Sequence, residues 1–287
     1  MGLFKRKSIK ISIIQMNILQ DDKDVNLTTA SRLIDECAFQ GTGIIVLPQA
    51  FATSINLPSL HQMAEPVPDG KIISFLSKKA VTHKTYIIAG ILEKEDSNVY
   101  DSAVVISPDG QLIGKYRRWF LWGMEKDFMA PGKPGKCIHT ELGKIGLLLG
   151  YDIGFPEACR SYFKEKVDIL ICMAAIFEDI SYPMEYLCRA RTMENHCYFV
   201  FASGLGYHMF GNTYYMGKSL IACDPLFLVF ELKQKAEPNF DIIGQLGKKE
   251  GILTRELFIE DLKKRVDKTP QYQDLEYAMS GIERERI

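Results

Sequence analysis

The spacing of hydrophobic and polar positions predicts alternating strands and helices along the first part of the chain. Residues 9–16 alternate between apolar and polar side chains and are rich in β-branched residues. Residues 44–47 and 86–92 are apolar runs of strand length. Between these runs, residues 27–40 and 70–83 carry apolar side chains at helical spacing. The order β-α-β-α-β predicts an α/β sheet.

The later part of the chain adds a hairpin and a second series of strands and helices. Pro108-Asp109-Gly110 separates two strand-like runs, which predicts a hairpin and therefore a mixed sheet. Asn26 is the predicted cap of the first helix. The remaining predicted elements are a helix over 157–166, a strand over 168–172, a helix over 182–195, a strand over 197–203, a hairpin-like pair over 219–222 and 226–232, a polar loop over 233–250, a last strand over 252–257 and a disordered end over 280–287.

A strand, a sharp turn and a helix meet in the stretch 146–157. The apolar run stops at Gly150, and Pro156 and Glu157 suit the first turn of a helix, because proline loses no needed hydrogen bond there and a carboxylate complements the positive helix end. Such an elbow presents side chains at the carboxyl edge of a sheet, where an enzyme would place a nucleophile. The residue at its tip is Gly150.

Several segments together resemble the nitrilase, or carbon-nitrogen hydrolase, superfamily over nearly the whole chain. The elbow is similar to the family pattern of an apolar run, Cys, Tyr-Asp, two variable residues and Phe-Pro-Glu, with Gly150 in place of the cysteine. The other matching segments are Ile45-Val46-Leu47-Pro48-Gln49, Gly114-Lys115-Tyr116-Arg117-Arg118-Trp119-Phe120-Leu121, Glu125 with Phe128 and Pro131-Gly132, Arg189-Ala190-Arg191-Thr192-Met193-Glu194-Asn195, Gly217-Lys218-Ser219 and Asp224-Pro225.

The resemblance implies a fold and a set of catalytic positions. The fold would be α/β, a four-layer α-β-β-α sandwich with two mixed sheets, formed by residues 1–287 as a single domain. Subunits would pair through their helices into a homodimer or larger homo-oligomer. Gln49 would stand at the position of the general base, Arg118 at that of the catalytic lysine and Gly150 at that of the nucleophile, with Glu125 as the auxiliary glutamate.

These residue types lead us to expect that thioester chemistry is lost. Glycine has no nucleophile, the Gln49 amide cannot act as a general base, and the Arg118 guanidinium stays protonated. We therefore expect a pseudo-hydrolase that cannot hydrolyse amides or nitriles through a thioester. It would bind a small anionic ligand, a carboxylate held by Arg118, beside the side-chain volume left empty at Gly150. The candidate ligand-binding residues are Gln49, Arg118, Glu125, Tyr151, Asp152 and Cys172.

Three alternatives stay open at this point. The chain could be an enzyme of altered carbon-nitrogen chemistry, such as a non-covalent condensation, cyclisation or hydrolysis that uses Arg118, Glu125, Tyr151 and Asp152. Arg118 could instead be fully engaged by Glu125, so that the pocket is merely filled. Cys172 could replace the missing thiol, although a cysteine in an apolar segment is more often a small buried hydrophobic residue.

Composition and charge narrow the classes of function. The chain has 287 residues, 47% of them hydrophobic, and 35 Lys and Arg against 36 Asp and Glu give a formal charge of -1, so neither nucleic acid nor membrane is expected as a partner. Seven scattered cysteines without a paired motif are typical of reduced thiols and predict a cytoplasmic protein. The five histidines lack metal-ligand spacing, so we expect no metal and no cofactor, and no segment is apolar enough to span a membrane.

Overall fold

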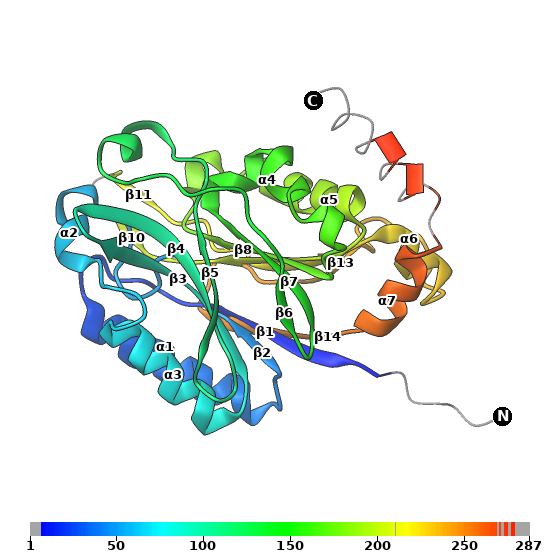
Figure 1. Ribbon diagram of the computed structural model, residues 1–287, viewed down its shortest axis with the longest axis horizontal. Coiled ribbons are helices and arrows are strands. Elements are labelled where there is room, and N and C mark those ends of the chain that lie inside the picture. The colour runs from blue at the N-terminus through cyan, green and yellow to red at the C-terminus, as the bar shows by residue number, and fades with distance from the viewer. Residues whose placement is uncertain (1–6, 210, 269, 271–272, 275–276, 279–287) are drawn as a thin grey trace.

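The computed structural model consists of two six-stranded sheets packed face to face, with helices on the outer side of each sheet (Figure 1). The predicted α/β four-layer α-β-β-α sandwich with two mixed sheets is therefore confirmed. The predicted disordered end, 280–287, lies outside the described part of the chain. The structure describes residues 7–209, 211–268, 270, 273–274 and 277–278.

The first sheet combines a parallel centre with antiparallel flanks. Its strands are β1 (Ile9–Gln15), β2 (Ile44–Val46), β3 (Tyr86–Glu95), β4 (Asn98–Ile106), β5 (Leu112–Arg117) and β14 (Gly251–Leu257). They lie in the order β14-β1-β2-β3-β4-β5. β1, β2 and β3 are mutually parallel, and β3, β4 and β5 form an antiparallel meander that contains the predicted hairpin.

The second sheet has the same plan. Its strands are β6 (Ile138–Thr140), β7 (Gly143–Leu149), β8 (Ile169–Ala174), β9 (Tyr198–Ser203), β12 (Leu220–Cys223) and β13 (Ile242–Gln245). They lie in the order β13-β12-β9-β8-β7-β6, and β7, β8 and β9 are parallel. A separate short hairpin is formed by β10 (Tyr207–His208) and β11 (Thr213–Tyr214).

Helices cover both outer faces, and three apolar cores fill the spaces between the layers. α1 (Lys23–Phe39) and α3 (Lys71–His83) lie on the first sheet, and α4 (Pro156–Arg160) and α5 (Met184–Asn195) lie on the second (Figure 1). The central core joins side chains of both sheets, such as Val46 and Leu147. The remaining helices are α2 (Leu60–Met63), α6 (Pro225–Phe230) and α7 (Ile259–Val266).

Residues 226–232 do not form the predicted strand. Asp224 accepts a hydrogen bond from the backbone N–H of Leu226 at 3.0 Å, and Pro225 occupies the first helical position, so the segment starts α6 instead. β12 pairs antiparallel with β9 on one side and with β13 on the other, and β13 lies within the segment predicted as a loop.

Two helix boundaries also differ from the prediction. α1 begins at Lys23 with Asp22 as its N-cap, while the Asn26 side chain instead bonds the backbone of Leu19 and Ala52. The helix expected over 157–166 ends as α4 at Arg160, and a separate 3₁₀ turn follows.

Candidate functional site

Most of the candidate residues meet at one edge of the sandwich. Gln49 follows β2, Arg118 follows β5, Gly150 follows β7, and Ala175 follows β8. A cavity of about 600 Å³ opens there. Its wall is formed by Gln49, Ile55, Leu57, Arg118, Trp122, Gly123, Met124, Glu125, Gly150, Tyr151, Ile153, Gly154, Ala175, Ile176, Phe177, Ile180, Pro183, Met184, Leu187, His208, Gly211 and Tyr215.

The elbow begins with a 3₁₀ turn over Gly150–Gly154, between β7 and α4. Gly150 has a φ of +42°, in the left-handed region that favours glycine. A Cβ built on Gly150 would lie 2.8 Å from Gln49 Oε1. The side-chain volume that we expected to be empty is therefore occupied by Gln49.

The Gln49 side chain is buried and held at both ends of its amide. Its Oε1 accepts a hydrogen bond from the backbone N–H of Ala175 at 2.8 Å, and its Nε2 donates to Asp101 Oδ2. Since Nε2 carries two protons, one donor remains for a bound molecule. Gln49 thus serves as a fixed hydrogen-bonding group in the cavity wall.

Asp101, in β4, is a charged residue of the site that the sequence analysis missed. Its Oδ2 lies 3.0 Å from Arg118 Nε, and both side chains are buried. Burial raises the pKa of the Asp101 carboxyl to about 6, although the Arg118 charge acts to lower it. The one available signal was an aspartate inside a mostly apolar strand, where a buried carboxylate requires a partner.

Glu125 reaches the cavity from a 3₁₀ turn over Gly123–Asp127. Its Oε2 lies 2.6 Å from Arg118 Nη2 and accepts the backbone N–H of Trp122 at 2.7 Å. Arg118 therefore lies between two carboxylates, those of Asp101 and Glu125. Within the described part of the chain, we find no hydrogen bond to Glu125 Oε1, so this oxygen can accept a proton donor from the cavity.

Tyr151 and Asp152 are neighbours in sequence but have different surroundings. Tyr151 is 41% exposed and lines the cavity. Asp152 is fully buried and outside the cavity wall, where it accepts hydrogen bonds from Tyr116 Oη at 2.7 Å and from the backbone N–H of Phe120 at 2.9 Å. These contacts connect the elbow to β5 and to the segment that follows it. Burial raises the pKa of Asp152 to about 6.

Cys172 lies within β8, and its side chain is not part of the cavity wall. Its Sγ contacts the backbone carbonyl of Gly150 at 4.0 Å. Burial raises the pKa of this thiol well above its usual range, so the reactive thiolate is strongly disfavoured. The structure does not place Cys172 as a replacement nucleophile.

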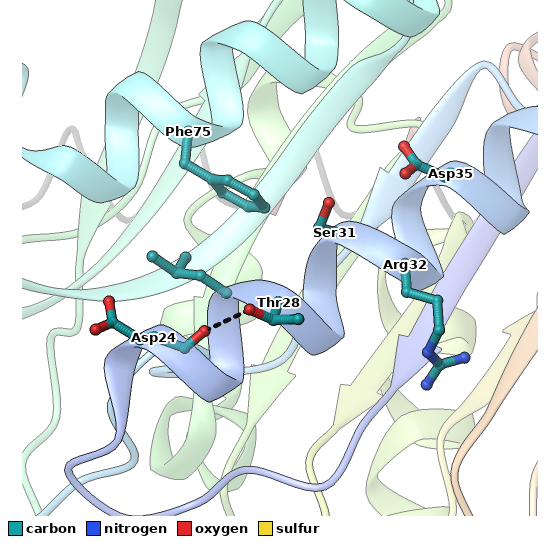
Figure 2. Close-up of a pocket in the computed structure, with 7 residues that line it drawn as sticks. Asp24, Thr28, Ser31, Arg32, Asp35 and Phe75 are labelled. Atoms are coloured by element: carbon teal, nitrogen blue, oxygen red, sulfur yellow. Dashed lines mark hydrogen bonds between the residues drawn. The ribbon is translucent and has the colours of Figure 1, made fainter.

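A second hollow, of about 670 Å³, lies on the helices that cover the first sheet (Figure 2). Its lining consists of residues of α1 together with Phe75 of α3, and the polar groups there have local partners: Thr28 Oγ1 donates to Asp24 O, and Asp35 pairs with Lys79 at 2.6 Å. It contains none of the candidate residues, so the cavity at the elbow is the candidate site.

In the part of the chain that the structure describes, no three His, Cys, Asp or Glu side chains are grouped closely enough to hold a metal ion. Among the same residues, no helix has both the length and the apolar character needed to cross a membrane.

Comparison with known proteins identifies the class to which this site belongs. Residues 10–263 match the family model of carbon-nitrogen hydrolases. A nitrilase from Pyrococcus abyssi is 36% identical over 224 residues, covering 75% of this chain and 81% of the relative. The omega-amidase NIT2 of Xenopus tropicalis is 31% identical over 206 residues, covering 68% and 74%. A CN-hydrolase superfamily protein from Xanthomonas campestris has a TM-score of 0.80 at 20% identity, with 93% of this chain and 97% of that chain covered.

The chain belongs to the carbon-nitrogen hydrolase family. The prediction of a pseudo-hydrolase that only binds an anionic ligand is contradicted, because relatives that match most of the chain are named as a nitrilase and omega-amidases. These names point to hydrolase activity. That Gln49, Arg118 and Gly150 occupy the catalytic positions of the family stays a prediction.

Proposed function

We propose that the protein hydrolyses the carbon-nitrogen bond of a small amide bound in the cavity at the elbow. Membership of the family and the names of its relatives support a hydrolase. One observation carries the proposal: the Glu125 carboxylate and the Arg118 guanidinium line the same cavity wall. Hydrolysis of an amide needs a base to activate water and a positive charge near the developing oxyanion.

Water is the nucleophile in this proposal. Glu125 Oε1 accepts a proton from the water molecule while the water oxygen adds to the amide carbon. Arg118 stabilises the negative charge on the former carbonyl oxygen. When the carbon-nitrogen bond breaks, the proton passes from Glu125 to the departing nitrogen, so that a carboxylic acid and ammonia, or an amine, are released and both protein groups return to their initial state.

Direct attack by water agrees with the groups around the elbow. Gly150 has no side chain to form a thioester, and the Cys172 thiol is buried outside the cavity wall. Glu125, by contrast, keeps one oxygen without a hydrogen-bond partner in the described residues. The reaction therefore needs no covalent intermediate.

Release of ammonia from aliphatic and aromatic amides tests this proposal. The wild-type protein is expected to turn over at least one of them. Glu125→Gln keeps the side-chain size but removes the base, so we expect kcat to fall by about 10² to 10⁴. Glu157→Gln changes an exposed glutamate outside the cavity and serves as the matched control. Equal rates for all three proteins, or no release above buffer, would contradict the proposal.

We also propose a cytoplasmic location and a homodimer. The location is supported by cysteines that are all unpaired and buried, as expected in a reducing compartment. The dimer is supported by the apolar side chains that α5 and the residues before it expose, with Tyr182 82% and Tyr186 59% accessible.

A further inference from the structure

The cavity at the elbow has an apolar wall around a small polar end. Aliphatic and aromatic side chains together form most of the wall, and the aliphatic ones include those of Leu57, Met124, Ile176, Met184 and Leu187. A molecule that enters this cavity exchanges water for hydrocarbon over most of its surface. Such contact favours apolar groups in proportion to the area that is buried.

An aromatic cluster forms one side of the same wall. Phe177 is stacked on Tyr215, with ring centroids 5.8 Å apart, and packs edge-on to Trp122 at 6.2 Å. The Tyr215 hydroxyl is hydrogen-bonded to Ser54 Oγ at 2.8 Å, so the polar atom of this ring is already satisfied. The cluster therefore presents ring carbon atoms to the cavity.

His208 adds no charge to this side of the cavity. Its Nε2 lies 2.6 Å from the backbone carbonyl of Ile55, which can only accept, so Nε2 donates. Its Nδ1 accepts the backbone N–H of Gly211 at 2.9 Å and therefore carries no proton. The imidazole is thus neutral, and both of its nitrogens have partners.

The positive charge at the polar end of the cavity is paired with neighbouring carboxylates. Arg118 is the only Lys or Arg among the described residues that line the cavity, and its guanidinium lies between Asp101 and Glu125. A carboxylate on the ligand would lose its hydration and would meet no unpaired cation. Burying an unpaired charge is strongly unfavourable, whereas an uncharged amide needs only a few hydrogen bonds.

We infer that the cavity selects amides of uncharged, apolar carboxylic acids and rejects amides whose acyl chain ends in a second carboxylate. The amide group lies at the Gln49, Arg118 and Glu125 end, and the alkyl or aryl body lies against the aliphatic and aromatic wall. The inference rests on the proposed function for the choice of an amide. The selection against negative charge follows from the wall itself and can be measured by binding alone.

Hexanamide and adipamate, the monoamide of hexanedioic acid, form a matched pair of probes. They share the amide and the chain length and differ at the far end, which is a methyl group in one and a carboxylate in the other. Trp122 lines the cavity, so the change in tryptophan fluorescence immediately after mixing reports binding before turnover. We expect hexanamide to bind the wild-type protein at least tenfold more tightly than adipamate.

A lysine introduced at the mouth of the cavity is expected to reverse part of this preference. Ile180 lines the cavity and is 45% exposed, so Ile180→Lys can be accommodated and gives the far carboxylate a partner. Ile113, in β5, is 40% exposed and outside the cavity wall, so Ile113→Lys is the matched control. We expect the ratio of the two dissociation constants to fall about tenfold in Ile180→Lys and to stay unchanged in Ile113→Lys.

The outcomes separate this inference from the proposed function. If adipamate binds the wild-type protein as tightly as hexanamide, or if neither binds, the inference is wrong. If hexanamide binds selectively but releases no ammonia, the inference stands and the proposed hydrolysis fails. If adipamate is hydrolysed in preference to hexanamide, hydrolysis stands and the inference fails.

Discussion

Gly150 and Gln49 are packed so closely that neither residue can be replaced by a larger one without a clash. The backbone at Gly150 is left-handed, and a Cβ there would approach the Gln49 amide. That amide is itself fixed by Ala175 and Asp101. A change at the elbow therefore acts on the whole polar end of the cavity.

We expect Gly150→Ala to destabilise the protein by about 1–3 kcal/mol. The left-handed conformation alone costs a residue with a Cβ about 1–2 kcal/mol, and displacement of the Gln49 amide adds to it. The measurement is the free energy of unfolding in urea. Gly154→Ala is the control, because a Cβ there meets no atom within 4 Å. Equal losses in the two variants would show that the elbow is not constrained as described.

Glu93 supplies a second test, away from the cavity. Its side chain is 1% exposed and pairs with Lys115 at 2.5 Å and with Arg117 at 2.6 Å. Burial acts to raise the pKa of Glu93, but hydrogen bonds from Arg117, Lys115 and Ser102 lower it to about 2. Because the folded-state pKa lies below the ordinary value of 4.5, the stabilisation is present above pH 4.5 and is lost as the pH falls through about 2.

We expect Glu93→Gln to lower the free energy of unfolding at pH 7 by about 3 kcal/mol, since the variant leaves two cations without their buried partner. The difference from the wild type should shrink as the pH is lowered from 4.5 toward 2. Glu95→Gln is the control, because Glu95 pairs with the same Arg117 but is 51% exposed, so its loss should change the free energy of unfolding much less. A pH-independent difference for Glu93→Gln would contradict the assignment.

The sequence predicted some of the site residues better than others. Gln49, Arg118, Glu125, Gly150 and Tyr151 do line one cavity, and each was named from a segment that resembles the family. Asp101 was missed, since its role depends on the pairing of β4 with β5, which brings it to Arg118. The aspartate within a mostly apolar strand indicates a buried partner, but it does not indicate which residue pairs with it across the sheet.

Among the secondary-structure elements, α6 shows how a cap can override a hydrophobic run. Residues 226–232 are almost continuously apolar and read as a strand, yet Asp224 and Pro225 start a helix there. Long periodic elements such as α3 and β1 were predicted within one residue at each end. Short apolar segments are ambiguous because a buried strand and a buried helical turn have the same composition.

The cap of α6 can be tested by replacing its side chain. Asp224 is buried, accepts from Leu226 and also contacts His196 Nδ1 at 3.0 Å. We expect Asp224→Ala to cost about 2 kcal/mol in thermal or urea unfolding. Asp22→Ala removes the exposed cap of α1, whose bond to Val25 is 3.2 Å long, and should cost about 0.5–1 kcal/mol. A larger loss at Asp22 than at Asp224 would contradict this ranking.

For the molecule as a whole, the two-sheet sandwich was predicted from the family resemblance and not from the hydrophobic pattern. The patterns predicted a mixed α/β sheet, but nothing in their spacing separates one large sheet from two stacked sheets. The strand orders β14-β1-β2-β3-β4-β5 and β13-β12-β9-β8-β7-β6 depend on contacts between distant segments. Those contacts bury side chains of one sheet against the other sheet, for example Val46 of β2 and Leu147 of β7.

We expect the protein to form a homo-oligomer through the exposed face that includes Tyr182 and Tyr186. Tyr182 and Tyr186 are in contact, with ring centroids 5.8 Å apart, and both are largely exposed. If this face of α5 is an interface, Tyr186→Lys should shift the molar mass measured by light scattering toward that of the monomer. Val81→Lys, at a 51% exposed position of α3, should leave the mass unchanged. A wild-type protein that is monomeric at micromolar concentration would refute the prediction.

The most direct test of the central claim is to follow hexanamide hydrolysis by product analysis and intact-protein mass spectrometry in the same reaction. We predict equal amounts of ammonia and hexanoate, an unchanged protein mass throughout turnover, and loss of both products in Glu125→Gln. The claim would be contradicted if a protein-bound acyl group accumulated, if Glu125→Gln were as active as the wild type, or if no amide of an apolar acid released ammonia.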